Sequence, residues 1–421
     1  MIVGVTFFVA LVSIGSRSSF GNFVTPMSEE FEWSRGLISV AGLVGMIAAG
    51  ICQPFAGWFY DKLGARKVIL TGVLILAGST VMLMATPHIA YLILGFGILG
   101  AIGSSASTIN ISGALLTRWF RKRRATALGI STAGASVGGL VLVPLTGYLV
   151  QVLDWRETWL VLGIIILTLG FPLSFLLLRN DPSDMGLRPD GERDTDAHGQ
   201  PTPPSTPVPG PLELDYWRAS LKSAPFWQLS LAYFACGATT SIMSFHFIPY
   251  AEEEGMTKST AALAFGLMSG LNVVGLLGAT ALADKFPRKN LLALVYGGRF
   301  LGYMMLFILP APWSIWAFAS VLGFSWWATG PLTTSLTADI YGLRFLGTLT
   351  GMTFLFHQLG AAASIQFAGN MHDLLGSYDM AFFAVACLLL LATLSSFGVK
   401  EREYSARYQV VMPQTSASTA G

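Results

Sequence analysis

The chain has 421 residues, of which 53% are hydrophobic and only 11% are charged, and its formal net charge is +2. Soluble domains carry roughly 25% charged residues, so this composition excludes a water-soluble protein of this length. The basic residues are dispersed among short polar segments, which excludes a nucleic-acid-binding surface. The three cysteines lie in apolar runs without metal-ligand spacing, so we expect neither a metal site nor a cofactor.

Apolar runs long enough to cross a bilayer recur along the whole chain. A membrane-spanning helix needs about 20 mostly apolar residues. Such runs lie near 2–25, 37–59, 68–86, 90–116, 125–150 and 157–178, and again near 225–250, 260–283, 290–309, 313–338, 346–371 and 379–399. We therefore predict an all-α membrane protein with twelve transmembrane helices in two six-helix halves. The first run lacks the small-residue cleavage site of a signal peptide, so it is expected to remain as a helix.

This pattern predicts four segments. They are an N-terminal half over 1–178, a linker over 179–223, a C-terminal half over 224–399 and a tail over 400–421. The linker is polar and rich in proline from Asp181 to Pro211, so it cannot bury an apolar face and is expected to be mobile. The sequence DYWRASLKS at 215–223 could form a short interfacial helix before the seventh span.

The distribution of lysine and arginine predicts the orientation of the chain. The loops on the linker side, together with the tail, carry 20 of these residues, and the opposite loops carry 3. Basic loops stay in the cytoplasm. Both termini and the linker are therefore expected to be cytoplasmic, in a multi-pass protein of the cell inner membrane.

The two halves repeat short sequences at a nearly constant offset. PMSEEFEWSR begins at Pro26 and PYAEEEGMTK begins at Pro249, 223 residues later. Asp61 and Asp284 have the same spacing, and RATALG at 124–129 matches LGTLTG 222 residues later. A duplicated half predicts a pseudo-symmetric transporter whose substrate site lies between the halves near the bilayer midplane.

The segment between the second and third spans carries a recognisable motif. The sequence GWFYDKLGARK places Gly57, Asp61, Gly64, Arg66 and Lys67 in the register of a known signature. It resembles the loop signature of the major facilitator superfamily, which implies that superfamily's twelve-helix fold. The stretch 280–289 is a degraded copy of the same motif.

The same motif suggests a conformational latch. A tight turn favours Gly64, and the Asp61 carboxylate can accept hydrogen bonds from a helix N-terminus or pair with a basic side chain. Together with Asp284 in the second copy, such a contact would hold the cytoplasmic ends of the halves together in one state. The alternative is a solvated loop whose charges only fix the topology.

The ionisable residues at bilayer depth are cationic. Arg17 in the first span and Arg299 in the ninth are the two intramembrane basic residues, and no carboxylate lies mid-membrane. Such residues mark functional sites by default, and an arginine can bind a carboxylate through two parallel hydrogen bonds. The first span lines the central cavity of this fold and Phe20 continues the face of Arg17, which favours Arg17. Both arginines could instead serve as interhelical contacts.

Further polar residues complete the predicted site. His357 and Gln358 lie mid-helix in the eleventh span, and Asn110 and Asn272 lie in the fourth and eighth. Histidine titrates near neutral pH, so His357 and His246 in the seventh span are candidates for proton coupling. The alternative for each histidine is a neutral ring that bonds across helices.

A closer resemblance narrows the solute class. GSRSSFGNF, then FEWSR, then TRWFRKRRATALGIS resemble bacterial relatives of monocarboxylate transporters and oxalate:formate antiporters. The resemblance implies small organic anions moved with a proton or by exchange. Monocarboxylate transporters usually carry an arginine in span eight, whereas this span, 260–283, offers only Asn272 as a sizeable polar group. A larger anion, or binding centred on Arg17, would fit this difference.

These observations favour a secondary active transporter for a small organic anion, driven by an ion or solute gradient through alternating access. The alternative is an efflux transporter that exports a metabolite or drug on the same fold. No nucleophile–base pair, metal cluster or phosphate-binding loop suggests an enzyme. The expected partners are the solute, a proton or counter-substrate, and the lipid bilayer, and the protein is expected to be a monomer.

Overall fold

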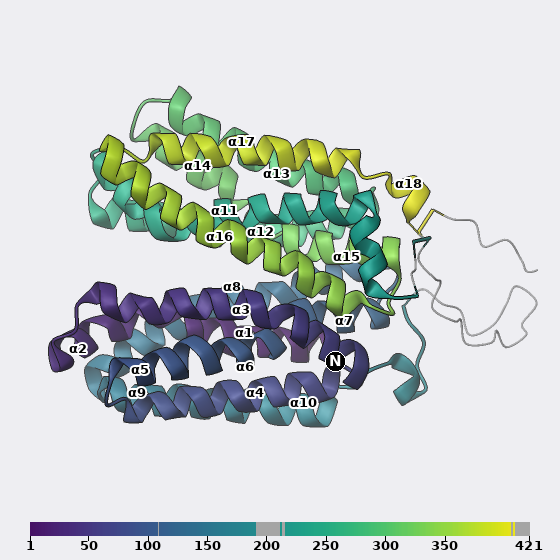
Figure 1. Cartoon of the computed structure of the whole chain (residues 1–421), viewed down its shortest axis with the longest axis horizontal. Helices are drawn as coiled ribbons and strands as arrows, with labels where there is room; N and C mark the ends of the chain where they lie inside the picture. Colours follow the sequence, from purple (N-terminus) through teal and green to yellow (C-terminus); the bar gives the residue numbers. More distant parts are fainter. Residues whose placement is uncertain (108, 191–210, 213–214, 406, 409–421) are drawn as a thin grey trace, which may run out of the picture.

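The structure, a computed structural model, describes the chain except residues 108, 191–210, 213–214, 406 and 409–421. Its described residues are helical apart from turns, loops and one isolated bridge between Phe120 and Asp190. Figure 1 shows two helical bundles lying side by side, one formed by the first half of the chain and one by the second.

The described part of the first bundle contains ten α-helices and several tighter or wider turns. They are α1 (Ile2–Ser18), α2 (Gly21–Phe31), α3 (Arg35–Leu63), α4 (Ala65–Met82), the 3-10 turn η1 (Leu83–Ala85), α5 (Ile89–Leu92), the π-helical η2 (Ile93–Leu99), α6 (Gly100–Ser107), α7 (Ile109–Trp119), α8 (Arg124–Val152), α9 (Trp155–Ile165), the π-helical η3 (Ile166–Gly170) and α10 (Phe171–Leu177). Short helices continue one another, so α1–α2, α5–α7 and α9–α10 each cover a single predicted span.

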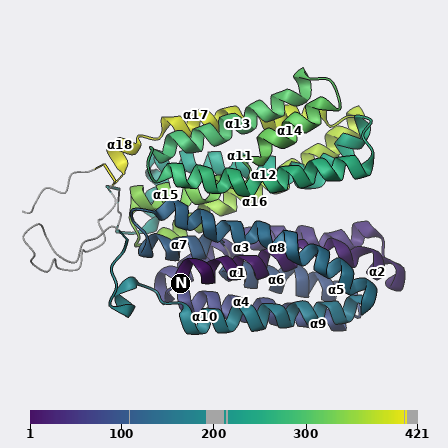
Figure 2. The same cartoon turned by 180° about the vertical axis from the view of Figure 1, so that it is seen from behind.

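The second bundle follows the linker. Its helices are α11 (Ala224–Glu253), α12 (Lys258–Ala283), α13 (Arg288–Ile308), α14 (Trp313–Gly323), α15 (Thr329–Tyr341), α16 (Leu346–Leu375) and α17 (Asp379–Gly398), and α18 (Glu401–Tyr404) begins the tail. Figure 2 shows the linker end of both bundles on the side of α15, α7 and α18.

Ten helical segments of the described chain are long and apolar enough to cross a membrane. The other two predicted spans differ from these ten. One is α16, a helix of 30 residues that carries polar side chains such as His357 and Gln358 among its apolar ones. The other, predicted over 313–338, is interrupted between α14 and α15. The all-α fold class is confirmed, and the tenth span is a broken helix rather than a continuous one.

Glycines allow the long helices to approach each other closely. A methyl group added at Gly15 of α1 would lie 2.6 Å from the carbonyl oxygen of Gly138 in α8. This separation is far below van der Waals contact, so the two backbones can touch only because both positions lack a side chain. Small residues at helix contacts are typical of membrane bundles.

The start of the linker corrects one expectation. Residues 191–210, the main part of the predicted mobile stretch, lie outside the described residues. The preceding residues are docked: Asp181 pairs with Arg118 at 3.1 Å, and the Asp190 carboxylate accepts hydrogen bonds from backbone N–H groups of 121–123. Two short 3-10 helices, η4 (Pro182–Met185) and η5 (Trp217–Lys222), flank the undescribed part. The second lies where a short helix was expected.

Candidate functional site

At the linker end, a carboxylate from each half binds the start of a helix in the other half. Asp61, near the end of α3, accepts hydrogen bonds from the backbone N–H groups of Gly347 and Thr348 at 3.0 and 2.8 Å. The Thr348 hydroxyl donates a third at 2.6 Å. Because the first N–H groups of a helix have no partner within the helix, the Asp61 carboxylate caps α16 across the boundary between the halves.

The second copy of the motif makes the same contact in the opposite direction. Asp284, after α12, accepts from the N–H groups of Ala125 and Thr126 at 2.8 and 2.9 Å, and from the Thr126 hydroxyl at 2.6 Å. These residues start α8 in the first half. The repeated aspartates therefore form two pseudo-symmetric contacts that close the linker end of the molecule.

The other predicted latch residues have separate roles. Gly64 forms the α3–α4 turn with φ of 80°, a left-handed conformation that favours glycine. A methyl group at Gly57 would lie 2.0 Å from the Gly347 carbonyl oxygen, so this glycine permits the α3–α16 contact. Arg66 donates to the carbonyl of Phe175 at 2.7 Å within its own half, and Lys67 is exposed. The basic pair thus lies outside the contact between the halves.

A buried charge cluster adjoins these contacts. Asp339, in α15, accepts from both Arg124, at the start of α8, and Arg288, at the start of α13. Arg124 belongs to the first half and Asp339 to the second, so the Arg124–Asp339 ion pair also joins the halves. All three residues are at most 8% exposed. An ion pair removed from water in this way is held by the surrounding packing and would be solvated if the halves separated.

Sequence reasoning did not identify this cluster, nor the carboxylate that supports it. Glu401, at the start of the tail, accepts from the N–H groups of Arg288 and Lys289 at 3.0 and 2.8 Å. Burial raises the pKa of Glu401, while the two backbone hydrogen bonds oppose that rise. Asn180 caps α4 similarly, by accepting from Arg66 N–H at 3.0 Å. The sequence signal that could have found these residues is their charge at predicted helix ends. It does not identify their partners, because those partners lie far away in the sequence.

Two polar contacts join the halves near the middle of their helices. The amide nitrogen of Asn272 in α12 donates to the hydroxyl of Ser136 in α8 at 3.2 Å. The amide nitrogen of Gln358 in α16 donates to the carbonyl of Met46 in α3 at 3.2 Å. Two of the predicted substrate-binding residues are therefore placed at the boundary between the halves, at mid-helix depth.

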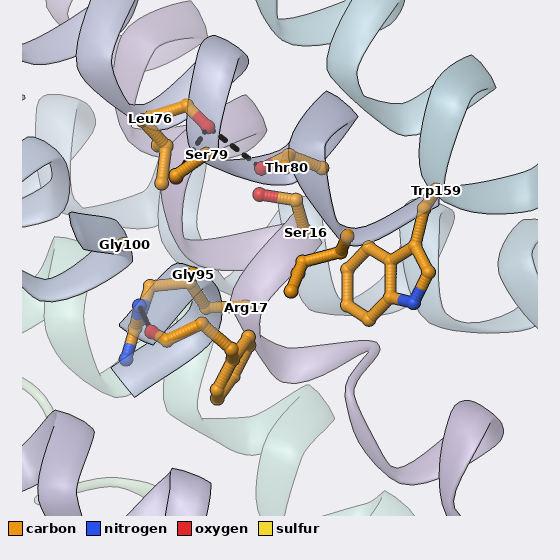
Figure 3. A pocket seen from close by; sticks show the side chains of 10 residues that line it. Ser16, Arg17, Leu76, Ser79, Thr80, Gly95, Gly100 and Trp159 are labelled. Atoms are coloured by element: carbon orange, nitrogen blue, oxygen red, sulfur yellow. Dashed lines mark hydrogen bonds between the residues drawn. The ribbon is translucent and has the colours of Figure 1, made fainter. Parts of the chain in front are cut away.

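Arg17 lies among helices of the first half (Figure 3). Its guanidinium donates a hydrogen bond to the backbone carbonyl of Phe96 at 3.2 Å. The guanidinium carbon also lies over the Phe96 ring, 4.7 Å from the ring centroid. The ring of Phe20 stacks on the ring of Phe96, with centroids 4.1 Å apart. The described residues place no carboxylate in an ion pair with Arg17, which remains half-buried. Its other N–H groups have no hydrogen bond among the described residues.

A small cavity adjoins Arg17. It has a volume of about 10 Å³ and is lined by Arg17, Ser79, Gly100 and Trp159, among others. This volume holds about one water molecule, so the cavity itself is not a solute site.

Arg299 holds the interruption of the tenth span. It is fully buried, and it donates to the backbone carbonyls of Ser325 and Trp326 at 2.6 and 2.7 Å. Asn272 completes this support by accepting from the N–H of Trp327 at 3.0 Å. Non-helical backbone at membrane depth is tolerated only where its polar groups find partners, and Arg299 and Asn272 provide them. This geometry favours an interhelical role for Arg299, which was the alternative to substrate binding.

The remaining predicted residues are dispersed. Asn110 is buried in α7. His246 lies toward the far end of α11, with its ring 5.1 Å from that of Tyr378. His357 lies near the middle of α16, with its ring 4.9 Å from that of Tyr233 in α11. The structure therefore brings His357, Gln358 and Arg299 toward one region of the second half and leaves Arg17 and Phe20 in the first.

A family model and two curated relatives place the chain in the same protein family. The family model described as Major Facilitator Superfamily matches residues 6–365. The chain is 28% identical over 380 residues to YcxA, an uncharacterized MFS-type transporter of Bacillus subtilis (89% of this chain and 88% of that protein). It is 23% identical over 395 residues to monocarboxylate transporter 12 of Rattus norvegicus (89% and 79%).

Solved structures agree on the fold. The proton:xylose symporter XylE superposes with a TM-score of 0.74 at 14% identity, covering 94% of each chain. The fucose:proton symporter FucP of E. coli superposes with a TM-score of 0.69 at 16% identity, covering 93% of this chain and 97% of that one. These similarities confirm the predicted fold class of two six-helix halves.

Proposed function

The chain belongs to the major facilitator superfamily, and on this premise we propose that it moves a small organic anion across the membrane by alternating access. The energy would come from a proton gradient or from exchange with a counter-substrate. The protein would work as a monomer in the cell inner membrane, with both termini in the cytoplasm.

The observation that carries the mechanism is the pair of crossed aspartate caps. Asp61 and Asp284 close the linker end, which the distribution of basic residues assigns to the cytoplasm. A transporter closed at the cytoplasmic end is open, or about to open, toward the outside. Rocking of the halves would break both caps and the Arg124–Asp339 pair, and would open the cytoplasmic end.

The charge at membrane depth supports an anionic solute. Arg17 is half-buried, and its described partners are a backbone carbonyl and an aromatic ring, so its charge is not neutralised by a neighbouring carboxylate. A carboxylate of the solute would supply the missing counter-charge. The similarity to a protein named monocarboxylate transporter 12 points to the same class.

Purified protein tests this proposal directly. Its thermal unfolding would be followed with lactate, pyruvate, oxalate and benzoate, and with neutral and cationic compounds of matched size. A ligand that binds the folded state raises the melting temperature. We expect one or more anions to do so in wild type and to lose the effect in Arg17→Ala. Stabilisation by neutral or cationic compounds alone would contradict the anion assignment.

A further inference from the structure

Arg299 belongs to a buried polar cluster that contains other reactive groups. Besides the two carbonyls of the broken span, its guanidinium contacts the Thr239 hydroxyl at 3.0 Å and the Cys236 sulfur at 3.5 Å. The Nε–H of Arg299 is buried and has no partner among the described residues. Every described acceptor of this cation is formally neutral, although Arg299 is 0% exposed.

A buried cation requires a nearby negative charge to offset its desolvation. Of the acceptors around Arg299, only the thiol of Cys236 can become an anion by losing a proton. Cys236 is 2% exposed and lies 3.0 Å from the Thr329 hydroxyl, which can donate to a thiolate. The cluster therefore has both a charge that favours a thiolate and a donor that can stabilise one.

His357 provides a proton-accepting group beside this thiol. The carbonyl of His357 packs against Gly237, the residue that follows Cys236, and a methyl group there would lie 1.8 Å from that oxygen. The His357 ring also packs against the ring of Tyr233, about one helical turn before Cys236 in α11, with the ring centroids 4.9 Å apart. Two ionisable groups of opposite type thus lie on neighbouring helices at the α11–α16 contact.

The hydrogen bonds of Gln358 assign the tautomer of His357. Because the Gln358 amide nitrogen donates to the Met46 carbonyl, its oxygen must be the atom that lies 3.1 Å from His357 Nδ1. An amide oxygen only accepts, so Nδ1 carries hydrogen. In the neutral ring Nε2 is then the atom that can accept a proton.

The surroundings contain no competing acid within the described residues. The helices around the cluster contribute Tyr233 beside His357, Tyr296 beside Arg299, Tyr303 beside Thr239, and Thr329 beside Cys236. Tyrosines ordinarily lose a proton only near pH 10. The thiol of Cys236 and the imidazole of His357 are therefore the acid and the base of this cluster among the described residues.

We propose that Cys236 and His357 together bind the proton that drives transport, beside the fixed charge of Arg299. In the unloaded form, the thiolate neutralises Arg299 and His357 is neutral with hydrogen on Nδ1. Loading adds one proton from water, by way of Nε2 of His357 to the sulfur, and raises the charge of the cluster by one. Unloading returns the same proton to water on the other side. This proposal rests on the proposed function of gradient-driven transport. It adds to that function the identity of the coupling ion and its binding site.

The same cluster is connected to the boundary between the halves. Charging His357 would strengthen its hydrogen bond to the Gln358 oxygen, and Gln358 contacts the first half at Met46. On the other side, Arg299 holds the broken span, and Asn272 connects that span to Ser136 of the first half. A proton in the cluster would therefore act on both mid-depth contacts.

Infrared spectroscopy of the S–H stretching band tests the site without a known solute. The protein would carry Cys52→Ser and Cys387→Ala, which leave Cys236 as its sole thiol, and Cys236→Ser in the same background would identify the band. We expect the band to appear on acidification, to disappear reversibly toward neutral pH, and to titrate in a different pH range in His357→Gln. Arg299 is kept in every variant, because its replacement is expected to destabilise the broken span.

Two results would overturn the proposal. One is an S–H band that stays present, or stays absent, from acidic to neutral pH, which would mean that Cys236 neither gains nor loses a proton in this range. The other is an identical titration in wild type and His357→Gln, which would mean that the groups are not coupled. Because no solute is involved, either result leaves the anion-transport proposal to its own thermal-unfolding test.

Discussion

Asp61 and Thr348 are 287 positions apart in the sequence, yet the Asp61 carboxylate accepts hydrogen bonds from both the N–H and the hydroxyl of Thr348. Asp284 makes the same two bonds to Thr126. Each half therefore contributes one carboxylate and one helix start. The contact is made twice, once in each direction across the boundary between the halves.

Asp61→Asn is expected to weaken this closure without unfolding either half. The amide loses the negative charge that favours a helix N-terminus. Charged hydrogen bonds contribute about 1.5–3 kcal/mol, so the closed population should fall about 10- to 140-fold relative to the open one. Distances between spin labels on the linker ends of α3 and α16 would report the shift, and transport in proteoliposomes should slow.

The matched control is Asp190→Asn, which removes a linker carboxylate that accepts hydrogen bonds from backbone groups of the first half. It should leave the distance between the halves unchanged. If both variants opened the linker end equally, or if Asp61→Asn transported at the wild-type rate, Asp61 would not be the latch.

Gly57→Ala should also oppose closure, because its methyl group would lie 2.0 Å from a backbone oxygen of the other half. The halves can relieve this clash by separating, so melting temperature should change little while the linker end opens. Gly138→Ala is the contrasting variant, since its methyl group would lie 2.3 Å from the Leu11 carbonyl oxygen within the same half. That clash should lower the melting temperature. Equal melting of both variants would contradict the distinction.

Arg17→Ala should lose solute affinity on the order of 2–5 kcal/mol, the usual effect of breaking a buried hydrogen-bonded charge pair. Arg17→Lys should lose less affinity than Arg17→Ala, because the lysine ammonium still attracts an anion. It should still bind more weakly than wild type, because a point charge cannot make two parallel hydrogen bonds. The stability of the solute-free protein should stay level or rise. Isothermal titration with the anion found by thermal screening measures the effect, and unchanged affinity in Arg17→Ala would remove Arg17 from the site.

Arg299→Ala should instead destabilise the solute-free protein. The carbonyls of Ser325 and Trp326 would lose their donor, and each buried unsatisfied group costs about 1–3 kcal/mol. Arg299→Lys should be intermediate, because its ammonium reaches fewer acceptors. Melting temperatures of the two variants and of wild type would show this order. A stable Arg299→Ala protein that fails only to bind solute would indicate a direct binding role.

A cysteine introduced at a position within 191–210 should react with a membrane-impermeant maleimide only after the cells are broken. The reason is the excess of basic residues in the loops on that side. A cysteine in place of Asp373, whose side chain is 84% exposed near the end of α16, should react in intact cells. The reverse labelling pattern would invert the proposed orientation.

The sequence by itself determined the class and the plan of this protein. Twelve apolar runs, their division into two groups and the repeated aspartates follow from hydropathy and spacing, because the bilayer imposes a length and a polarity on every span. It also indicated that Asp61 could cap a helix, since an exposed helix start attracts a carboxylate wherever one is near.

Only the tertiary structure decided that Asp61 caps the start of α16, and which groups each buried charge contacts. The sequence shows that Arg299 lies at membrane depth, but not that it supports a broken span or lies 3.5 Å from Cys236. Nor does it show that Arg124 shares Asp339 with Arg288. These partners are brought together by the packing of helices remote in the chain, and local sequence patterns carry no record of such distances.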